Sequence, residues 1–68
     1  MSDIDEIQLT SYYELSDQLS AAIDTGNTGA AVSALGSAHL AYVVRLISTD
    51  QYAELRADFS EAYPDIAI

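Results

Sequence analysis

Residues 3–24 carry apolar side chains at the spacing of an amphipathic helix. At about 100° per residue, one face collects Ile4, Tyr12, Leu15, Leu19, Ala22 and Ile23, with Ile7 and Leu9 at its borders. Acidic residues gather on the opposite face, and no Gly or Pro interrupts the segment. The pattern predicts a helix over 3–24 that Ser2 caps. Ser11 and Glu14 also form a capping-box pattern, which would begin a shorter helix at Tyr12.

Residues 49–63 show a second amphipathic pattern. Ser48 and Gln51 make a capping box before it, and Pro64 stops the helix after it. The apolar stripe consists of Tyr52, Leu55, Phe59, Ala62 and Tyr63. The other side carries Asp50, Glu54, Asp58 and Glu61. We expect a helix over 49–63, followed by a short tail in which Ile66 and Ile68 pack back on the bundle.

The middle segment, residues 28–47, differs from both neighbours because it lacks acidic residues. Its large apolar side chains spread over more than half of a helical circumference. The rest of the circumference carries a strip of small side chains that ends at Arg45. The strip consists of Ala30, Ala34, Ser37, Ala38 and Ala41. A helix that is apolar nearly all round must be covered nearly all round. We therefore expect a helix over 28–47 whose smooth strip lets another helix backbone approach closely.

These three segments predict an all-α protein, a single helical domain over 1–68. The simplest arrangement is a small antiparallel three-helix bundle with the second helix at its centre and the acidic residues outside. No segment alternates with a period of two long enough to predict a strand. Two neighbours cannot cover the whole second helix, so we expect a homodimer formed through it. The predicted dimer interface consists of Ala34, Ala38, Ala41, Tyr42 and Arg45.

Chain length also favours association. A domain of 68 residues buries only about 60% of the surface that its unfolded chain exposes. The sequence contains no cysteine, so neither a disulfide nor a thiolate-bound metal can reinforce so small a core. Close helix packing and binding to another chain are the remaining sources of stability.

The stretch AIDTGNTGA, residues 22–30, contains the one motif that suggests catalysis. Its Asp-Thr-Gly resembles the catalytic loop of retropepsin-like aspartic proteases, a family that pairs two such carboxylates. That family builds the loop on β-strands and carries a later apolar-apolar-Gly motif, and neither has a counterpart in this sequence. A turn explains the same letters, with Gly26 ending one helix and Asn27 or Thr28 capping the next. We therefore interpret Asp24 as the last residue of a helix.

Other chemical signatures are equally incomplete. GNTG is not followed by the Lys of a phosphate-binding loop, and DTGNTG lacks the oxygen ligands and closing Glu of a calcium loop. His39 is the only histidine, which argues against a zinc site within one chain and favours a hydrogen-bonded histidine in the core or an interface. No serine lies in a nucleophile motif. We expect no enzymatic activity, no cofactor and no bound metal.

Charge narrows the class of partner. Eleven acidic residues against two arginines give a net charge of −9, which disfavours direct binding to nucleic acid and to anionic membranes. Gly29–Ile47 is nearly long enough to span a membrane, but His39, Arg45 and many small residues argue against it. The first residues lack the features of a secretory signal, so we expect a cytoplasmic protein. Its partner would present a basic surface.

We expect a non-enzymatic, acidic protein-binding module that acts as an inhibitor or regulator. By analogy of composition, it is similar to small proteins of phages and mobile elements, including nucleic-acid mimics such as some anti-CRISPR proteins. The predicted partner-binding residues are Tyr13, Glu14, Asp17, Asp50, Glu54, Asp58 and Glu61. The alternative is a structural or accessory helical subunit that self-assembles in a salt-adapted organism, where acidity serves solvation.

Overall fold

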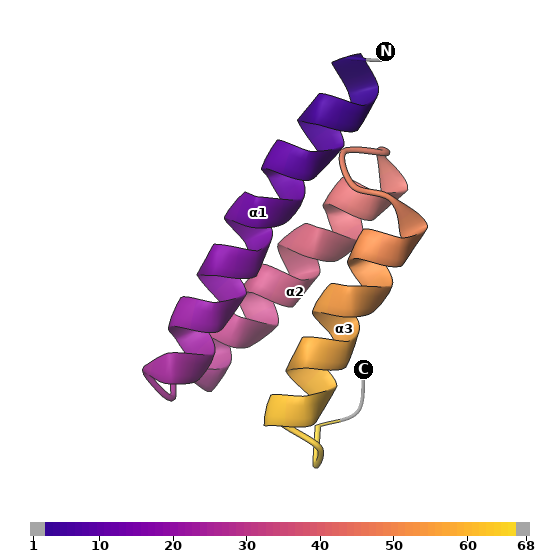
Figure 1. Ribbon diagram of the computed structural model, residues 1–68. Helices are drawn as coiled ribbons and strands as arrows, with labels where there is room; N and C mark the ends of the chain where they lie inside the picture. The colour runs from indigo at the N-terminus through magenta and orange to yellow at the C-terminus, as the bar shows by residue number, and fades with distance from the viewer. Residues whose placement is uncertain (1–2, 67–68) are drawn as a thin grey trace.

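The computed structural model describes residues 3–66, which form three helices: α1 (Asp3–Asp24), α2 (Thr28–Val43) and α3 (Thr49–Ala62). Within these residues there is no strand. The chain runs along α1, returns along α2 and turns again into α3, so α1 and α3 are parallel (Figure 1). Each helix packs on the other two. The predicted all-α three-helix bundle is confirmed for the described residues.

Helix α1 is continuous from Asp3, so the shorter helix beginning at Tyr12 is wrong. Tyr12 and Leu15 pack against the core, and Gln8 Nε2 donates a hydrogen bond to the carbonyl oxygen of Arg45 at 3.2 Å. The first turns of α1 extend past the α2–α3 connection (Figure 1). The predicted cap Ser2 and the tail residue Ile68 lie outside the described residues.

The turn between α1 and α2 accounts for the Asp-Thr-Gly motif. Gly26 adopts a φ of 69°, a left-handed conformation that glycine reaches without strain. Its N–H donates to the carbonyl oxygen of Ile23, and the N–H of Asn27 donates to that of Ala22, the hydrogen-bond pair of a Schellman motif. Asn27 then caps α2 by accepting a bond from the Ala30 N–H at 3.0 Å. The prediction of a turn at this motif is confirmed.

Helix α2 ends at Val43, four residues before the predicted end at residue 47. Arg45 has a φ of 68°, and the N–H groups of Arg45 and Leu46 complete a second Schellman motif on Tyr42 and Ala41. In a continued helix, residue 47 would lie two turns beyond Leu40, which is exposed. The reversal instead makes Ile47 fully buried, so burial of this side chain explains the early end.

Helix α3 begins with the predicted capping box. The Gln51 N–H donates to Ser48 Oγ at 3.2 Å, and the Ser48 N–H donates to Gln51 Oε1 at 2.9 Å. The helix ends at Ala62, and Ile66 in the tail packs against the core as expected. Among residues 3–66, none of the helices combines the length and apolar character that a membrane-spanning segment needs.

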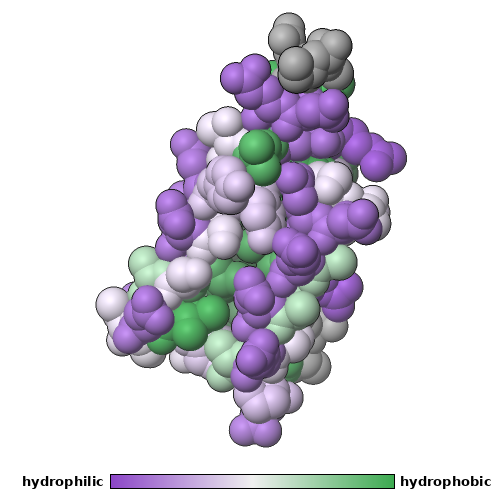
Figure 2. Space-filling view, viewed as in Figure 1, coloured by the Kyte–Doolittle hydropathy of each residue, from purple (hydrophilic) through white to green (hydrophobic). Residues whose placement is uncertain are grey.

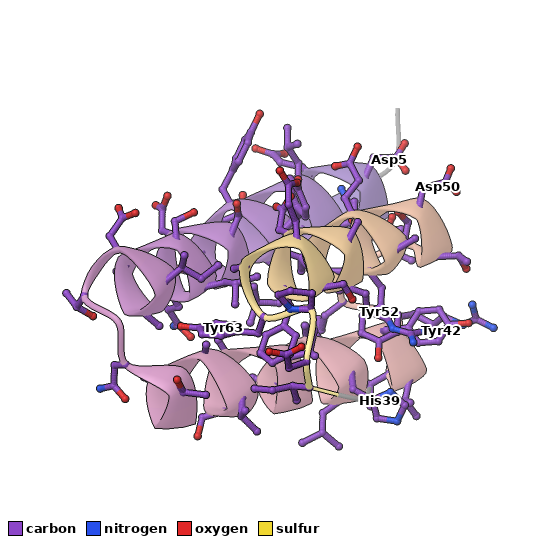
Figure 3. The ribbon with its side chains drawn as sticks, turned by 90° about the horizontal axis from the view of Figure 1, so that it is seen from below. Asp5, His39, Tyr42, Asp50, Tyr52 and Tyr63 are labelled. Carbon is purple, nitrogen blue, oxygen red and sulfur yellow. The ribbon has the colours of Figure 1, made fainter. Side chains whose placement is uncertain are left out.

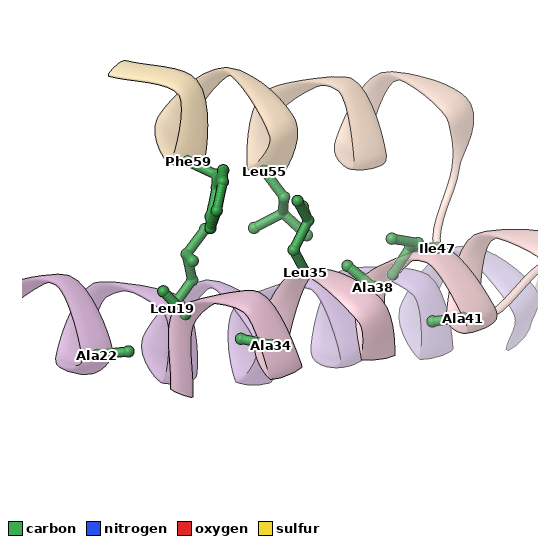
Figure 4. Packing of buried hydrophobic residues seen from close by; sticks show 10 residues of the cluster. Leu19, Ala22, Ala34, Leu35, Ala38, Ala41, Ile47, Leu55 and Phe59 are labelled. Carbon is green, nitrogen blue, oxygen red and sulfur yellow. The ribbon is translucent and has the colours of Figure 1, made fainter. Parts of the chain in front are cut away.

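The core lies between the three helices and is rich in alanine. Leu55 and Phe59 of α3 point toward Leu19 of α1 and Leu35 of α2 (Figure 4). The buried apolar residues are Leu19, Ala22, Ala31, Ala34, Leu35, Ala38, Ala41, Ile47, Leu55 and Phe59. Half of these are alanines, which let helix backbones approach closely but bury little apolar area each.

Candidate protein-binding surface

Acidic side chains from two helices meet in a groove between the C-terminal halves of α1 and α3. Asp24 of α1 lies on one side of this groove, and Asp58 and Glu61 of α3 lie on the other. The remaining lining residues are Ser20, Ile23 and Ala62. Since α1 and α3 are parallel neighbours, the groove lies between the last turns of both helices. We call it the α1–α3 groove.

Tyr12 and Glu54 connect the same two helices closer to their N-terminal ends. The Tyr12 hydroxyl donates a hydrogen bond of 2.7 Å to Glu54 Oε2. Tyr13, the next residue on α1, is exposed, and its ring centroid lies 5.8 Å from that of Tyr12. An exposed aromatic side chain therefore lies beside the Tyr12–Glu54 pair, closer to the N-terminal ends of the two helices than the α1–α3 groove.

The environment of Tyr12 changes its acidity. The hydrogen bond to Glu54, burial and the charges of Glu54 and Asp58 raise the pKa of Tyr12 from 10.0 to about 12. In the unfolded chain this phenol ionises near pH 10, whereas the folded chain keeps it protonated. Its contribution to stability is therefore fully present below pH 10 and is lost as the pH rises from 10 to about 12.

We predict that Glu54→Ala returns the pKa of Tyr12 from about 12 toward 10, because it removes the acceptor and the nearest charge. The measurement is a spectrophotometric phenolate titration, in which subtracting a Tyr12→Phe titration in each background isolates Tyr12. Glu61→Ala is the matched control on the same helix and should leave the Tyr12 pKa high. A Tyr12 pKa that stays near 12 in Glu54→Ala would contradict the hydrogen bond.

All seven predicted partner-binding residues are exposed, but they do not share one surface. On α3, Asp50, Glu54, Asp58 and Glu61 recur at helical spacing along the side that faces α1. On α1, Tyr13 and Asp17 are spaced to lie on one ridge with Asp24. Glu14 is turned about 100° from Tyr13 around the helix, away from this ridge.

Two residues of this surface were not among the predicted partner-binding residues. Tyr12 fits the apolar stripe, which indicates a core or rim position, and it does pack against the core while its hydroxyl bonds Glu54. Asp24 fits the acidic face of the first helix, but we interpreted it only as the last residue of that helix. It lies seven residues after Asp17 and hence on the same helical ridge, and this spacing is the signal that could have identified it.

Both arginines lie away from the α1–α3 groove. Arg45 is in the α2–α3 connection, and the Arg56 guanidinium lies 5.8 Å from the centroid of the Tyr52 ring. On the face seen in Figure 2, hydrophilic side chains follow α3 and border an apolar area between α3 and the lower part of α1. Ile23 lines the groove in this region. The groove therefore combines two apolar side chains, Ile23 and Ala62, with three carboxylates and no basic residue among those that line it.

A cluster of rings covers the opposite side of α3, where it meets α2. Tyr42 stacks on Tyr52 with ring centroids 4.9 Å apart and an interplanar angle of 8°. His39 Nδ1 lies 3.3 Å from the Tyr52 hydroxyl, so this histidine is hydrogen-bonded as expected but exposed rather than in the core. Figure 3 shows these rings on one side of the bundle. Tyr42 thus packs within the chain.

Three of the five residues predicted for the dimer interface are buried inside the chain. Ala34, Ala38 and Ala41 are buried in the core with Leu19 and Ala22 of α1, and Arg45 lies beyond the end of α2. Small side chains do allow close helix packing, but the helix that packs on these alanines is α1 of the same chain. The exposed large apolar residues of α2, which are Val32, Leu40 and Val43, lie on the side of the helix away from these alanines.

No three metal-ligating side chains among residues 3–66 lie close enough together to hold an ion. The sequence matches no protein family model, and comparisons with curated proteins and with solved structures give no match. The geometry of the α1–α3 groove and the exposed apolar residues of α2 are therefore the observations on which a function can be argued.

Proposed function

We propose that the protein is a non-enzymatic acidic module that binds a protein partner through the α1–α3 groove. The observation that supports this most directly is the meeting of Asp24, Asp58 and Glu61 in one groove. Carboxylates concentrated on one face attract a basic surface over a distance and set the orientation in which it docks. No cofactor or metal takes part in the proposed activity.

The groove suits lysine or arginine side chains of the partner. Their aliphatic stems would lie against Ile23 and Ala62, while their charged ends would reach Asp24 and Asp58. Tyr13, exposed at the N-terminal end of this surface, is the aromatic residue best placed to become buried on binding. Such a surface would compete with phosphates for a basic site, as an inhibitor or regulator of phage or mobile-element origin does when it mimics nucleic acid.

The experiment compares two double variants with the same change in charge. Asp58→Lys with Glu61→Lys alters the groove, whereas Glu6→Lys with Glu14→Lys alters exposed acids outside it. Binding of a fluorescent arginine-rich peptide, as a stand-in for a basic surface, is measured by anisotropy at low salt. We expect the groove pair to weaken binding at least about tenfold more than the control pair, a difference of about 1.4 kcal/mol.

Equal losses in the two double variants would overturn the groove proposal, because net charge alone would then explain binding. Circular dichroism of each variant checks that the helices are retained. The same two pairs then serve to verify any protein that the wild type captures from its host.

A second candidate function is self-assembly, as a structural or accessory helical subunit. The observation in its favour is the number of large apolar side chains that the bundle leaves exposed, three of them on α2. Completion of the bundle as a homodimer through α2 is part of this proposal and is compatible with the acidic groove, which lies between the other two helices.

A further inference from the structure

One side of α2 is apolar and faces solvent. Val32, Leu40 and Val43 are 48%, 66% and 58% exposed, and with Gly36 they recur at helical spacing along a single stripe. We call these four residues the α2 outer face. Val44 and Leu46, both exposed, extend it past the end of the helix. No acidic residue occurs between Asp24 and Asp50, so this stripe carries no negative charge.

Gly36 lies in the middle of the α2 outer face, and the described chain gives no packing reason for a glycine there. No atom of residues 3–66 outside its neighbours and local helix backbone lies within 4 Å of a Cβ built at this position. Its φ is not in the left-handed region either. Glycine inside a helix nevertheless destabilises it relative to alanine. Gly36 therefore destabilises α2 without making room for any other part of the described chain. The approach of a backbone from another molecule would explain it.

We infer that the α2 outer face binds the same face of a second copy, with the two α2 helices crossing at Gly36. This inference deepens the homodimer part of the proposed function. Small residues at a crossing point allow two helices to come close, and Val32 and Leu40 on either side then pack against the partner copy. The interface is isologous, as in most homodimers.

Charge indicates which surface two copies of the chain can share. Each chain carries a net charge of −9, and two such chains associate most easily through the surface that lacks acidic residues. Pairing through α2 leaves the carboxylates of the α1–α3 groove on the outside of the dimer. Among residues 3–66, only five apolar side chains larger than alanine are buried, so burying the α2 outer face adds substantially to the buried apolar area.

The two α2 helices should be antiparallel. The first turns of α1, which carry Asp5 and Glu6, project beyond the bundle next to the C-terminal end of α2 (Figure 1). Parallel helices would place these acidic ends of both copies together, whereas antiparallel helices place them at opposite ends. With Gly36 at the twofold axis, Val32 of one copy then lies opposite Leu40 of the other.

The first test is the mass in solution of the purified protein at about 0.15 M salt, where repulsion between exposed charges is screened. We expect twice the 7.3 kDa mass of the chain at micromolar concentrations. Leu40→Gln and Gly36→Ala should each raise the dimer dissociation constant at least about tenfold. Leu9→Gln is the matched control, because Leu9 is exposed on α1 and should leave the dimer intact.

Gly36→Ala separates an interface from a merely tolerated glycine. If nothing approached Gly36, alanine would stabilise the helix and leave the mass unchanged. If the proposed dimer forms, Gly36→Ala stabilises the separate chain but weakens the association of two chains. A wild-type monomer at high micromolar concentration would overturn the inference, as would a dimer that Leu9→Gln disrupts and Leu40→Gln does not.

Disulfide trapping decides whether the two α2 helices are parallel or antiparallel. Because the sequence contains no cysteine, only the introduced cysteines can form a disulfide. Val32→Cys mixed with Leu40→Cys should form a mixed disulfide across an antiparallel pair, whereas Val32→Cys alone would cross-link readily only if the helices were parallel. These measurements use the protein without a partner. Failure of the dimer is therefore distinguishable from failure of the groove, which the charge-reversal pairs test separately.

Discussion

Phe59→Ala is expected to remove most of the stability of the bundle. Phe59 is fully buried and points from α3 toward Leu19 of α1, with Tyr63 5.2 Å away from ring centroid to ring centroid. Truncating a buried phenylalanine to alanine costs about 3–5 kcal/mol, since apolar burial is lost and a cavity is left. A domain of 68 residues has a total stability of only about 3–10 kcal/mol.

The measurement is urea unfolding followed by helical circular dichroism, at one protein concentration for all variants, because association adds to apparent stability. Phe59→Leu is the control; it keeps most of the volume and should cost less than about 1.5 kcal/mol. A loss below about 1 kcal/mol in Phe59→Ala would show that α3 is not held on α1 and α2 by this side chain.

Ile47→Ala is expected to cost about 2–5 kcal/mol, more than any other truncation in the connections between helices. Ile47 is fully buried although it lies in the irregular segment between α2 and α3. Its burial accompanies the left-handed conformation of Arg45 and the capping of α3 by Ser48. Removing the side chain should therefore loosen the connection as well as the core.

The matched control is Ile7→Ala, the same substitution at an isoleucine that is 48% exposed on α1. We expect it to cost less than about 1 kcal/mol, because alanine favours a helix and little burial is lost. Comparable losses for the two isoleucines in urea unfolding would contradict the burial of Ile47. Such a result would restore the longer second helix that the apolar pattern predicts.

Local signals in the sequence predicted the turns and helix starts well. Gly26 ends α1, Asn27 caps α2 and Ser48 with Gln51 caps α3, because each of these motifs is completed within a few residues of chain. The amphipathic patterns of α1 and α3 were equally informative. Each helix has one face that must be buried and one that carries acidic residues, so the spacing shows which side faces the bundle.

The acidic surface was predicted in part. Helical spacing identified the ridge on α3, but it could not show that α1 lies beside α3 and that Asp24 therefore faces Asp58 and Glu61. That neighbourhood depends on how three helices pack, as does the hydrogen bond between Tyr12 and Glu54 across 42 residues of sequence. The proposed binding groove is a property of the tertiary structure.

By itself, the sequence determined the all-α class, the capped ends, the acidic sides of α1 and α3 and the lack of negative charge along α2. The tertiary structure decided where α2 ends and which of its sides is free. A nearly uniform apolar helix has no pattern that distinguishes its neighbours, so packing assigned the alanines to α1 and left Val32, Leu40 and Val43 exposed. Packing also buried Ile47 in the core, and this burial accompanies the end of α2 at Val43.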